Sequence, residues 1–218
     1  VLMASFSDST ALTAHSGLLL WPIEFSLDAY KRVLSNQNIW TGYLNTIKYL
    51  VLGVSTSMIM TILGAYVLSR KDFLLRRPIM LAITFTMFFG GGMIPTYLNL
   101  NSLHMLNTRG VMFVPAAISA TNFIIMRNYF TQSVPAELIE AAHMEGASEL
   151  QILTKIVLPL SKSILGVLTI YYMSGHWNSY FSAMIYLSKD ELRPLQVFLR
   201  RVLIQGGMDG MSTGSTMT

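Results

Sequence analysis

Long apolar runs alternate with short charged segments along most of the chain. Residues 49–69 hold no charged side chain, and Lys48 is the only charge between residues 41 and 69. A helix needs about 20 mostly apolar residues to cross the hydrocarbon core of a bilayer. The pattern therefore predicts a membrane span over residues 41–69.

A second uncharged run begins at Pro78 and predicts a span over residues 78–97. Glycines at residues 90–92 and Pro95 interrupt this run, and both residue types break helices. Non-helical backbone at membrane depth occurs only where protein or a water-filled cavity covers it. Residues 90–95 are thus predicted to form either the outer end of the span or part of a pore lining.

Two further apolar runs predict spans over residues 110–130 and 162–187. The first is short and contains Pro115 and Asn122, and polar residues in a span usually face the bundle interior. The second is rich in Tyr and Trp toward its far end, and these residue types favour the membrane interface. Together the four runs predict an all-α, polytopic transmembrane helical bundle.

The segment between the last two predicted spans, residues 133–160, is too polar for a span and too apolar for a plain loop. Ser133 offers a capping side chain, Pro135 suits a first turn, and Glu137 places an acid near the positive end of a helix dipole. A first helix is therefore predicted from about residue 135 to 145. Gly146 then suits a C-terminal cap with positive φ.

A second helix is predicted to begin at Ser148, because Ser148 and Gln151 have the spacing of a capping box. It is expected to reach about Val157 and to stop before Pro159, since proline disfavours helix in the residue before it. Apolar residues occupy two of its faces: Leu150, Leu153 and Val157 on one, Ile152 and Ile156 on the other. The segment is thus predicted to be a helical hairpin that packs on the spans with one side and receives a partner with the other.

Composition places these helices in a membrane. Hydrophobic residues make up 52% of the chain and charged residues 12%, against about 25% charged in a soluble domain. The net charge of +4 fits the basic loops of a membrane protein, and no nucleic-acid partner is predicted. Four basic residues at 70–77 mark this loop, and with it the hairpin, as cytoplasmic by the positive-inside rule.

The remaining loops are then predicted to lie on the outer side, including residues 5–40 and 188–218. The chain opens on Val1 without an initiator methionine or a basic leader. Residues 1–4 are apolar and are interpreted as the tail of a preceding span. The chain, residues 1–218, is therefore interpreted as a single transmembrane domain that is a fragment of a longer protein.

The sequence carries no pattern that indicates catalysis. It has no cysteine, which excludes a disulfide framework, a thiolate metal site and a cysteine nucleophile. It has no G-x-x-x-x-G-K-[ST] run for nucleotide phosphates, and its four histidines lack metal-ligand spacing with acidic partners. We predict no catalytic residue, no metal and no cofactor, and hence a chain that is not an enzyme.

The hairpin resembles the EAA motif of ABC importer permeases, which has the form EAA-x3-G-x9-I-x-LP. All seven defined positions are present: Glu140, Ala141, Ala142, Gly146, Ile156, Leu158 and Pro159. In that family the motif forms a coupling helix seated in a cleft of the ATPase. The resemblance therefore implies that these seven residues couple the chain to an ATPase.

Residues 90–100 (GGGMIPTYLNL) and 176–199 are similar to carbohydrate-uptake permeases. The nearest resemblance is to permeases for oligosaccharides such as polygalacturonan fragments and to the smaller permease of maltose-type systems. It implies the type I ABC importer permease fold, with four spans present of an expected six and the first and last lacking. It also implies a multi-pass protein of the bacterial plasma (inner) membrane that forms half of a translocation pathway for an oligosaccharide.

The same resemblance implies four kinds of partner. A second permease subunit completes a heterodimer, and a dimer of ATP-binding cassette ATPase chains hydrolyses the ATP. An extracytoplasmic solute-binding protein delivers the sugar, and membrane lipids surround the spans.

The predicted substrate path rests on polar and aromatic residues in the spans. The candidates are Asn122, Asn128, His176, Trp177, Asn178 and Tyr180. Apolar clefts with a few polar groups are the usual binding sites for small molecules. The alternative interpretation is that Trp177 and Tyr180 are interface anchors and Asn178 makes a helix–helix hydrogen bond.

Three other functions are compatible with parts of the pattern. An ABC permease for a non-sugar solute, such as an amino acid or a lipid, shares the hairpin. A secondary transporter needs no ATPase but often carries intramembrane charges for ion coupling, and none is evident in these spans. A structural membrane subunit without a path is disfavoured by the broken segment at residues 90–95.

Overall fold

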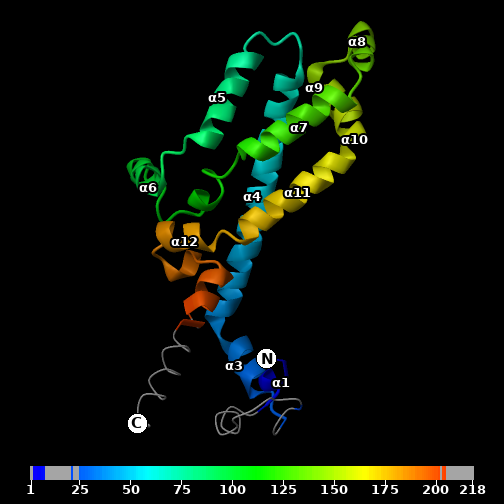
Figure 1. The fold of residues 1–218 in the computed structure, drawn as a ribbon. Coiled ribbons are helices and arrows are strands. Elements are labelled where there is room, and N and C mark those ends of the chain that lie inside the picture. Colours follow the sequence, from blue (N-terminus) through cyan, green and yellow to red (C-terminus); the bar gives the residue numbers. More distant parts are fainter. Residues whose placement is uncertain (1, 8–20, 22–24, 202, 205–218) are drawn as a thin grey trace. The chain divides into compact units, whose positions relative to one another are not determined.

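The computed structural model describes residues 2–7, 21, 25–201 and 203–204. Regular structure in this part is helical, apart from an isolated antiparallel bridge between Ser7 and Phe25, and the predicted all-α class is confirmed. Parts of the predicted outer segments, residues 8–20, 22–24 and 205–218, lie outside the described residues. The chain divides into two compact units, residues 1–46 with 193–218 and residues 47–192 (Figure 1).

The first unit joins the start of a long helix to a segment near the end of the chain. Its helices are α1 (Leu2–Ser5), α3 (Asp28–Ser35), the start of α4 (Gln37–Ser69) and residues 195–201 and 203–204. The backbone N–H of Leu195 donates to Oγ1 of Thr46 at 3.0 Å, and the side-chain amide of Asn45 donates to the carbonyl of Arg193 at 3.3 Å. A Cβ at Gly42 would lie 3.1 Å from the Cα of Leu195, so glycine permits this approach.

The second unit contains the rest of α4 and all of the elements between residues 69 and 193. In chain order these are α5 (Arg76–Phe88), α6 (Met93–Ser102), η1 (Arg109–Met112), α7 (Ala120–Ser133), α8 (Ala136–Met144), α9 (Glu149–Ile152), η2 (Leu153–Val157), α10 (Leu158–Leu160), α11 (Lys162–Trp177), α12 (Tyr180–Tyr186) and η3 (Asp190–Leu192). Figure 1 shows α8 and α9 at the same end of this unit as the end of α4.

Helix α4 packs through a stripe of small residues. A Cβ at Gly53 would lie 2.6 Å from the imidazole of His176, and a Cβ at Gly64 would lie 2.6 Å from the ring of Phe123. Small residues let neighbouring helices approach closely, as is usual between helices in membranes. The stripe therefore brings α7 and α11 against α4.

The core of the unit lies at the end of α4 and joins it to the hairpin. Two hydroxyl-bearing residues that precede this core along α4, Ser57 and Thr61, are also fully buried. The main cluster contains Ala65, Tyr66 and Leu68 from α4, Phe123, Met126 and Phe130 from α7, Ala142, Ile152, Leu153 and Val157 from the hairpin, and Leu168 from α11. The hairpin is therefore part of the folded core and not an appended loop.

By length and composition, α4 alone among the described helices could cross a membrane, and two bent helix pairs raise the number to three if each pair is one span. The pairs are Arg76–Phe88 with Met93–Ser102, bent by 118°, and Glu149–Leu160 with Lys162–Trp177, bent by 85°. Helix α4 covers the predicted span 41–69 and begins four residues earlier, at Gln37.

The glycine-rich segment breaks the helix, as the sequence predicts. Helix α5 ends at Phe88 and α6 begins at Met93, with Gly92 at a φ of 82° between them. Only glycine adopts such a φ readily. The predicted span 78–97 is thus two helices and not one continuous helix.

The other two predicted spans are also interrupted. Residues 110–130 contain the short helix η1, a non-helical stretch around Pro115, and α7, which begins only at Ala120. Residues 162–187 contain α11 and α12, separated at Asn178 and Ser179. Neither segment forms one continuous helix, and at Pro115 the reason is that proline lacks the N–H that continues a helix.

Candidate functional site

The turn of the hairpin is a Schellman motif built on Gly146. The N–H of Gly146 donates to the carbonyl of His143 at 2.9 Å, and the N–H of Ala147 donates to the carbonyl of Ala142 at 3.0 Å. These two bonds satisfy carbonyls at the end of α8, and Gly146 has the positive φ, 79°, that the motif requires. The predicted cap is confirmed. A side chain at Gly146 would be strained by about 1–2 kcal/mol through its φ alone.

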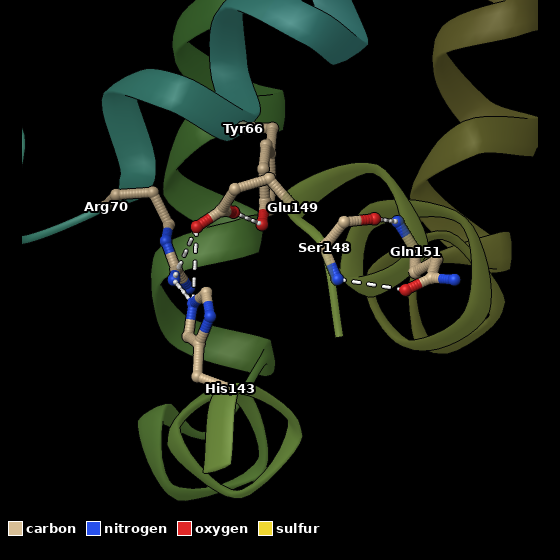
Figure 2. A network of polar contacts seen from close by, with 6 residues as sticks. All are labelled: Tyr66, Arg70, His143, Ser148, Glu149 and Gln151. Carbon is tan, nitrogen blue, oxygen red and sulfur yellow. Dashed lines mark hydrogen bonds and ion pairs between the residues drawn. The ribbon is translucent and has the colours of Figure 1, made fainter. Parts of the chain in front are cut away.

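The second helix of the hairpin begins with the predicted capping box. The backbone N–H of Gln151 donates to Oγ of Ser148 at 3.4 Å, and the backbone N–H of Ser148 donates to Oε1 of Gln151 at 2.9 Å (Figure 2). The prediction that Ser133 caps the first helix of the hairpin is wrong. Ser133 is the last residue of α7, and Pro135 is the residue that precedes α8, without a side-chain cap.

The second helix does not stop before Pro159, in contrast to the prediction. It passes through η2, a π-helical turn over Leu153–Val157, and continues in α10 to Leu160. The N–H of Leu158 donates to the carbonyl of Leu153, five residues back. This wider turn accommodates the proline ring, which in a regular α-helix clashes with the carbonyl four residues earlier. The chain instead bends at Ser161, which is buried, before α11 begins.

The seven motif residues divide between the core and the surface. Ala142 is 7% exposed and belongs to the core cluster, while Ile156 and Leu158 pack against that cluster. The others, Glu140, Ala141, Gly146 and Pro159, are exposed. The two alanines therefore have different roles: Ala141 faces outward, whereas the small side chain of Ala142 lets α8 approach its own core.

Two large apolar residues of the hairpin are exposed beside the motif. Met144 is 89% exposed and Leu150 is 66% exposed. Sequence reasoning placed Leu150 on one face with Leu153 and Val157, but those two residues are buried and Leu150 is not. The outward surface of the hairpin, formed by Glu140, Ala141, Met144 and Leu150, is called the hairpin surface below.

A polar network joins the hairpin to the end of α4. The hydroxyl of Tyr66 donates to the carboxylate of Glu149, and the guanidinium of Arg70 lies 3.7 Å from the same carboxylate. Arg70 also lies over the Tyr66 ring, 5.6 Å from its centroid. Figure 2 shows Tyr66 of α4, Arg70 directly after α4 and Glu149 of α9 converging.

His143 takes part in this network through a single ring nitrogen. Its Nε2 lies 3.0 Å from Nη2 of Arg70 and 3.2 Å from Oε1 of Glu149 (Figure 2). A ring nitrogen offers either a lone pair or a proton. His143 therefore either accepts a hydrogen bond from Arg70 or donates one to Glu149, and in both cases the end of α8 is tied to its neighbours.

A cavity of about 470 Å³ lies in the second unit, away from the hairpin. Its polar and aromatic lining residues are Ser119, Asn122, Tyr171, Tyr172, His176, Ser179, Ser182 and Tyr186. Among the residues that the structure describes, no lysine, arginine, aspartate or glutamate lines it. It therefore offers hydroxyl groups, one side-chain amide, one imidazole and aromatic rings.

The wall of this cavity is attached to α4 by buried hydrogen bonds. Oγ of Ser57 lies 3.2 Å from Nε2 of His176, and Oγ1 of Thr61 lies 2.7 Å from the hydroxyl of Tyr172. The Tyr172 hydroxyl also accepts from the N–H of Ser119 at 3.4 Å. These bonds fix the orientation of two lining side chains.

Of the six candidate path residues, the structure brings Asn122 and His176 to the cavity, and Asn128 is not among its lining residues. Trp177, Asn178 and Tyr180 are not among its lining residues, although they lie close in sequence to His176. The Asn178 amide donates to the carbonyl of Ser174 within its own helix, at 2.8 Å. The aromatic lining by Tyr171 and Tyr172 was missed, because an uncharged run gives no sign of which face turns inward.

The described residues contain no group of three or more His, Asp or Glu side chains placed to hold a metal ion.

A helical bundle with long apolar segments, a core-anchored hairpin and an uncharged polar cavity defines a membrane transport subunit. The chain belongs to the family described as "Binding-protein-dependent transport system inner membrane component", which it matches over residues 39–209.

Curated relatives and a solved structure agree with this assignment. The chain is 39% identical over 220 residues to YtcP of Bacillus subtilis (strain 168), named a polygalacturonan/rhamnogalacturonan transport system permease protein, covering 99% of this chain and 76% of the relative. It is 35% identical over 217 residues to the protein LplC of the same organism, covering 100% of this chain and 72% of the relative.

The structure resembles a chain in the crystal structure of a bacterial ABC transporter involved in the import of the acidic polysaccharide alginate. The TM-score is 0.87 and the identity 42%, covering 92% of this chain and 71% of that chain. The predicted resemblance and the ABC importer permease fold are confirmed. The chain is a transport subunit of the inner membrane and not an enzyme. Membership of this family excludes the alternative of a secondary transporter. A solute-binding protein and an ATPase are partners that such a subunit implies.

Proposed function

We propose that this chain forms half of the pathway through which an ATP-driven importer moves an oligosaccharide across the bacterial inner membrane. A second permease subunit would form the other half. The named functions of two relatives support a carbohydrate, since one is a polygalacturonan/rhamnogalacturonan permease and another belongs to an alginate importer. A non-sugar solute is the competing possibility within the same family.

The cavity supports contact with sugar hydroxyls and not with sugar carboxylates. Burying a charged carboxylate without an opposite charge beside it is costly, and the described lining residues include no lysine or arginine. Hydroxyls and an amide can exchange hydrogen bonds with sugar hydroxyls, and tyrosine rings can cover the apolar face of a sugar ring. Any carboxylates on the substrate would then be recognised elsewhere in the transporter.

In this proposal the chain is a multi-pass protein whose spans fall at residues 41–69, 78–97, 110–130 and 162–187, of which the last three are interrupted as described above. Residues 133–160 lie on the cytoplasmic side and residues 188–218 outside. The basic residues of the loop at 70–77 support this orientation. The polar network also ties this loop to the hairpin, so the two belong on the same side.

The hairpin surface is proposed as the contact with the ATPase. The observation that carries this proposal is that Glu140 and Ala141 are exposed next to Met144, a large apolar side chain that is 89% exposed. Apolar residues surrounded by polar ones are typical of surfaces that bind another protein. Ala142, Ile156 and Leu158 would act from inside, by fixing the hairpin to the core that also contains α4 and α11.

The chain has no natural cysteine, so single-cysteine variants can test this contact. Ala141→Cys places the thiol on the hairpin surface, and Ala142→Cys is the matched control one residue away in the core. Inside-out membranes containing the whole transporter would be labelled with a maleimide, before and after the ATPase subunits are stripped. We expect Ala141→Cys to be protected by the ATPase and Ala142→Cys to react slowly in both states. Equal labelling of Ala141→Cys with and without the ATPase would contradict the proposed contact.

The substrate class is tested by uptake in the same membranes. We expect oligosaccharides to compete with one another for uptake and amino acids or lipids to have no effect. Competition by a non-sugar solute alone would favour the alternative function.

A further inference from the structure

A second cavity, separate from both sites described above, lies between α5 and α7. Its volume is about 430 Å³, and its lining residues are Arg76, Arg77, Met80, Leu81, Thr84 and Arg127. Three of these six residues are arginines and none is acidic. The cavity therefore concentrates positive charge beside apolar side chains.

The positive charge of this cavity meets no acidic residue in the described lining. Among the described residues, no carboxylate forms an ion pair with Arg76, Arg77 or Arg127. Arg76 and Arg77 are the first two residues of α5, and the first turn of that helix contains no acidic residue. A helix N-terminus carries a partial positive charge, so the arginines and the helix dipole repel one another. A bound anion would remove this repulsion.

Arg127 is held in position by hydrogen bonds from its own guanidinium. Its Nε donates to the carbonyl of Leu68 at 3.2 Å, and its Nη1 donates to Oδ1 of Asn128 at 3.0 Å. These bonds use two of the five N–H donors of the guanidinium. The remaining donors, with those of Arg76 and Arg77, suit the oxygens of a phosphate group, which guanidinium groups bind in a bidentate manner.

An apolar surface continues from the arginines along α5. Leu81, Phe85 and Phe88 follow Arg77 at intervals of four, eight and eleven residues, which places all four on one face of the helix. Leu81 is 71% exposed, the two phenylalanines are also exposed, and α5 contains no buried residue. The face therefore has a charged end and an apolar length, as an amphiphilic ligand does.

We propose that this cavity binds an anionic phospholipid of the cytoplasmic leaflet. The phosphate lies against Arg76, Arg77 and Arg127, and an acyl chain follows Leu81 and the phenylalanines of α5. Basic cavities between helices at the cytoplasmic side of a membrane bind such headgroups in other proteins. The proposal rests on the orientation proposed above, in which the loop at residues 70–77 is cytoplasmic. A free phosphate ion would use the arginines but would leave the apolar face of α5 without a role.

The test uses the whole transporter in nanodiscs of phosphatidylcholine with increasing amounts of phosphatidylglycerol. The probe is phosphatidylglycerol with a photoactivatable acyl chain, and crosslinking to residues 76–88 is mapped by mass spectrometry. Removal of one arginine, in Arg77→Gln, is expected to weaken binding about 5-fold, and Arg76→Gln with Arg77→Gln about 25-fold. The matched control is Lys162→Gln, which removes an exposed positive charge that does not line the cavity and is expected to change nothing.

Water-soluble glycerophosphoglycerol, the same headgroup without acyl chains, is added as a competitor. No displacement supports a lipid site, whereas displacement shows a site for a free phosphodiester and overturns the proposal. Equal crosslinking in all variants also overturns it. So does loss of the ATPase from the Arg77→Gln transporter with lipid crosslinking intact, since the arginines would then contact a protein. Oligosaccharide uptake is measured in parallel: failure of uptake by the wild-type transporter, with its lipid crosslinking intact, would contradict the proposed function and still support the lipid site.

Discussion

Removal of the Glu149 carboxylate should loosen the hairpin without unfolding it. In Glu149→Ala the hydroxyl of Tyr66 loses its acceptor and the guanidinium of Arg70 loses its nearest carboxylate. His143 remains close to Arg70, but the link from α9 to α4 through this network is gone. We therefore expect the hairpin to open locally more often, while the apolar core beneath it stays intact.

The magnitude follows from the two contacts and their exposure. A hydrogen bond to a charged group contributes about 1.5–3 kcal/mol when it is well buried. The Glu149 side chain is 58% exposed, so solvent screening reduces this to about 1 kcal/mol. The Arg70 contact, at 3.7 Å and with Arg70 only 16% exposed, adds about 0.2–1 kcal/mol. The loss is therefore about 1–2 kcal/mol in the free energy of local opening.

Hydrogen–deuterium exchange of the assembled transporter measures this free energy directly. A loss of about 1–2 kcal/mol corresponds to exchange about 5- to 30-fold faster in amides of the hairpin, since a tenfold change is about 1.4 kcal/mol. Tyr66→Phe, which removes only the hydroxyl, should give the larger part of the effect, and the double variant should add little to Glu149→Ala. Glu145→Ala is the control, because Glu145 is an exposed acid on the same hairpin.

Two results would refute this reasoning. The first is exchange in Glu149→Ala no faster than in Glu145→Ala, which would show that the network contributes nothing to hairpin stability. The second is full additivity of Tyr66→Phe and Glu149→Ala, which would show that the two groups do not interact.

Two further predictions concern the packing of α4 and the polar cavity. Gly64→Ala should destabilise the subunit by about 1–3 kcal/mol, seen as a lower melting temperature of the purified transporter, because the new Cβ would lie 2.6 Å from the buried ring of Phe123. Gly166→Ala, where the Cβ meets open space, should not lower it, and equal effects would contradict this account. Asn122→Ala should reduce oligosaccharide uptake several-fold at unchanged expression, because Asn122 lines the polar cavity, whereas Asn178→Ala should not. A larger loss of uptake in Asn178→Ala than in Asn122→Ala would place the substrate path outside this cavity.

Local features of the hairpin were predictable from the sequence because each depends on neighbours in the chain. Gly146 forms the Schellman turn and Ser148 the capping box with Gln151, as predicted. These motifs are decided by φ angles and by side chains within three to five residues. The helix break at residues 90–92 likewise depends on local residues, namely the glycines between α5 and α6. Pro159 is the exception, since a π-helical turn upstream lets the helix continue through it.

The tertiary structure decided which residues face inward. Ala141 and Ala142 are identical and adjacent in sequence, yet one is exposed and the other lies in the core. Likewise, Asn122 reaches the cavity and Asn178 does not, although both were candidates on equal grounds. In an apolar helix hydrophobicity does not distinguish a face that meets lipid from one that meets protein, so the pattern alone cannot assign these positions.

The sequence by itself determined the class of protein. Long uncharged runs indicate a membrane, and the spacing of the EAA motif can be read directly from the sequence. Only the tertiary structure showed the network of Tyr66, Arg70, His143 and Glu149, whose members lie up to 83 residues apart. The cavity of Arg76, Arg77 and Arg127 likewise required two helices to meet. Contacts between distant segments depend on how the helices pack. Gly53 and Gly64 permit the close approach of His176 and Phe123, and the sequence does not show which residues lie opposite these glycines.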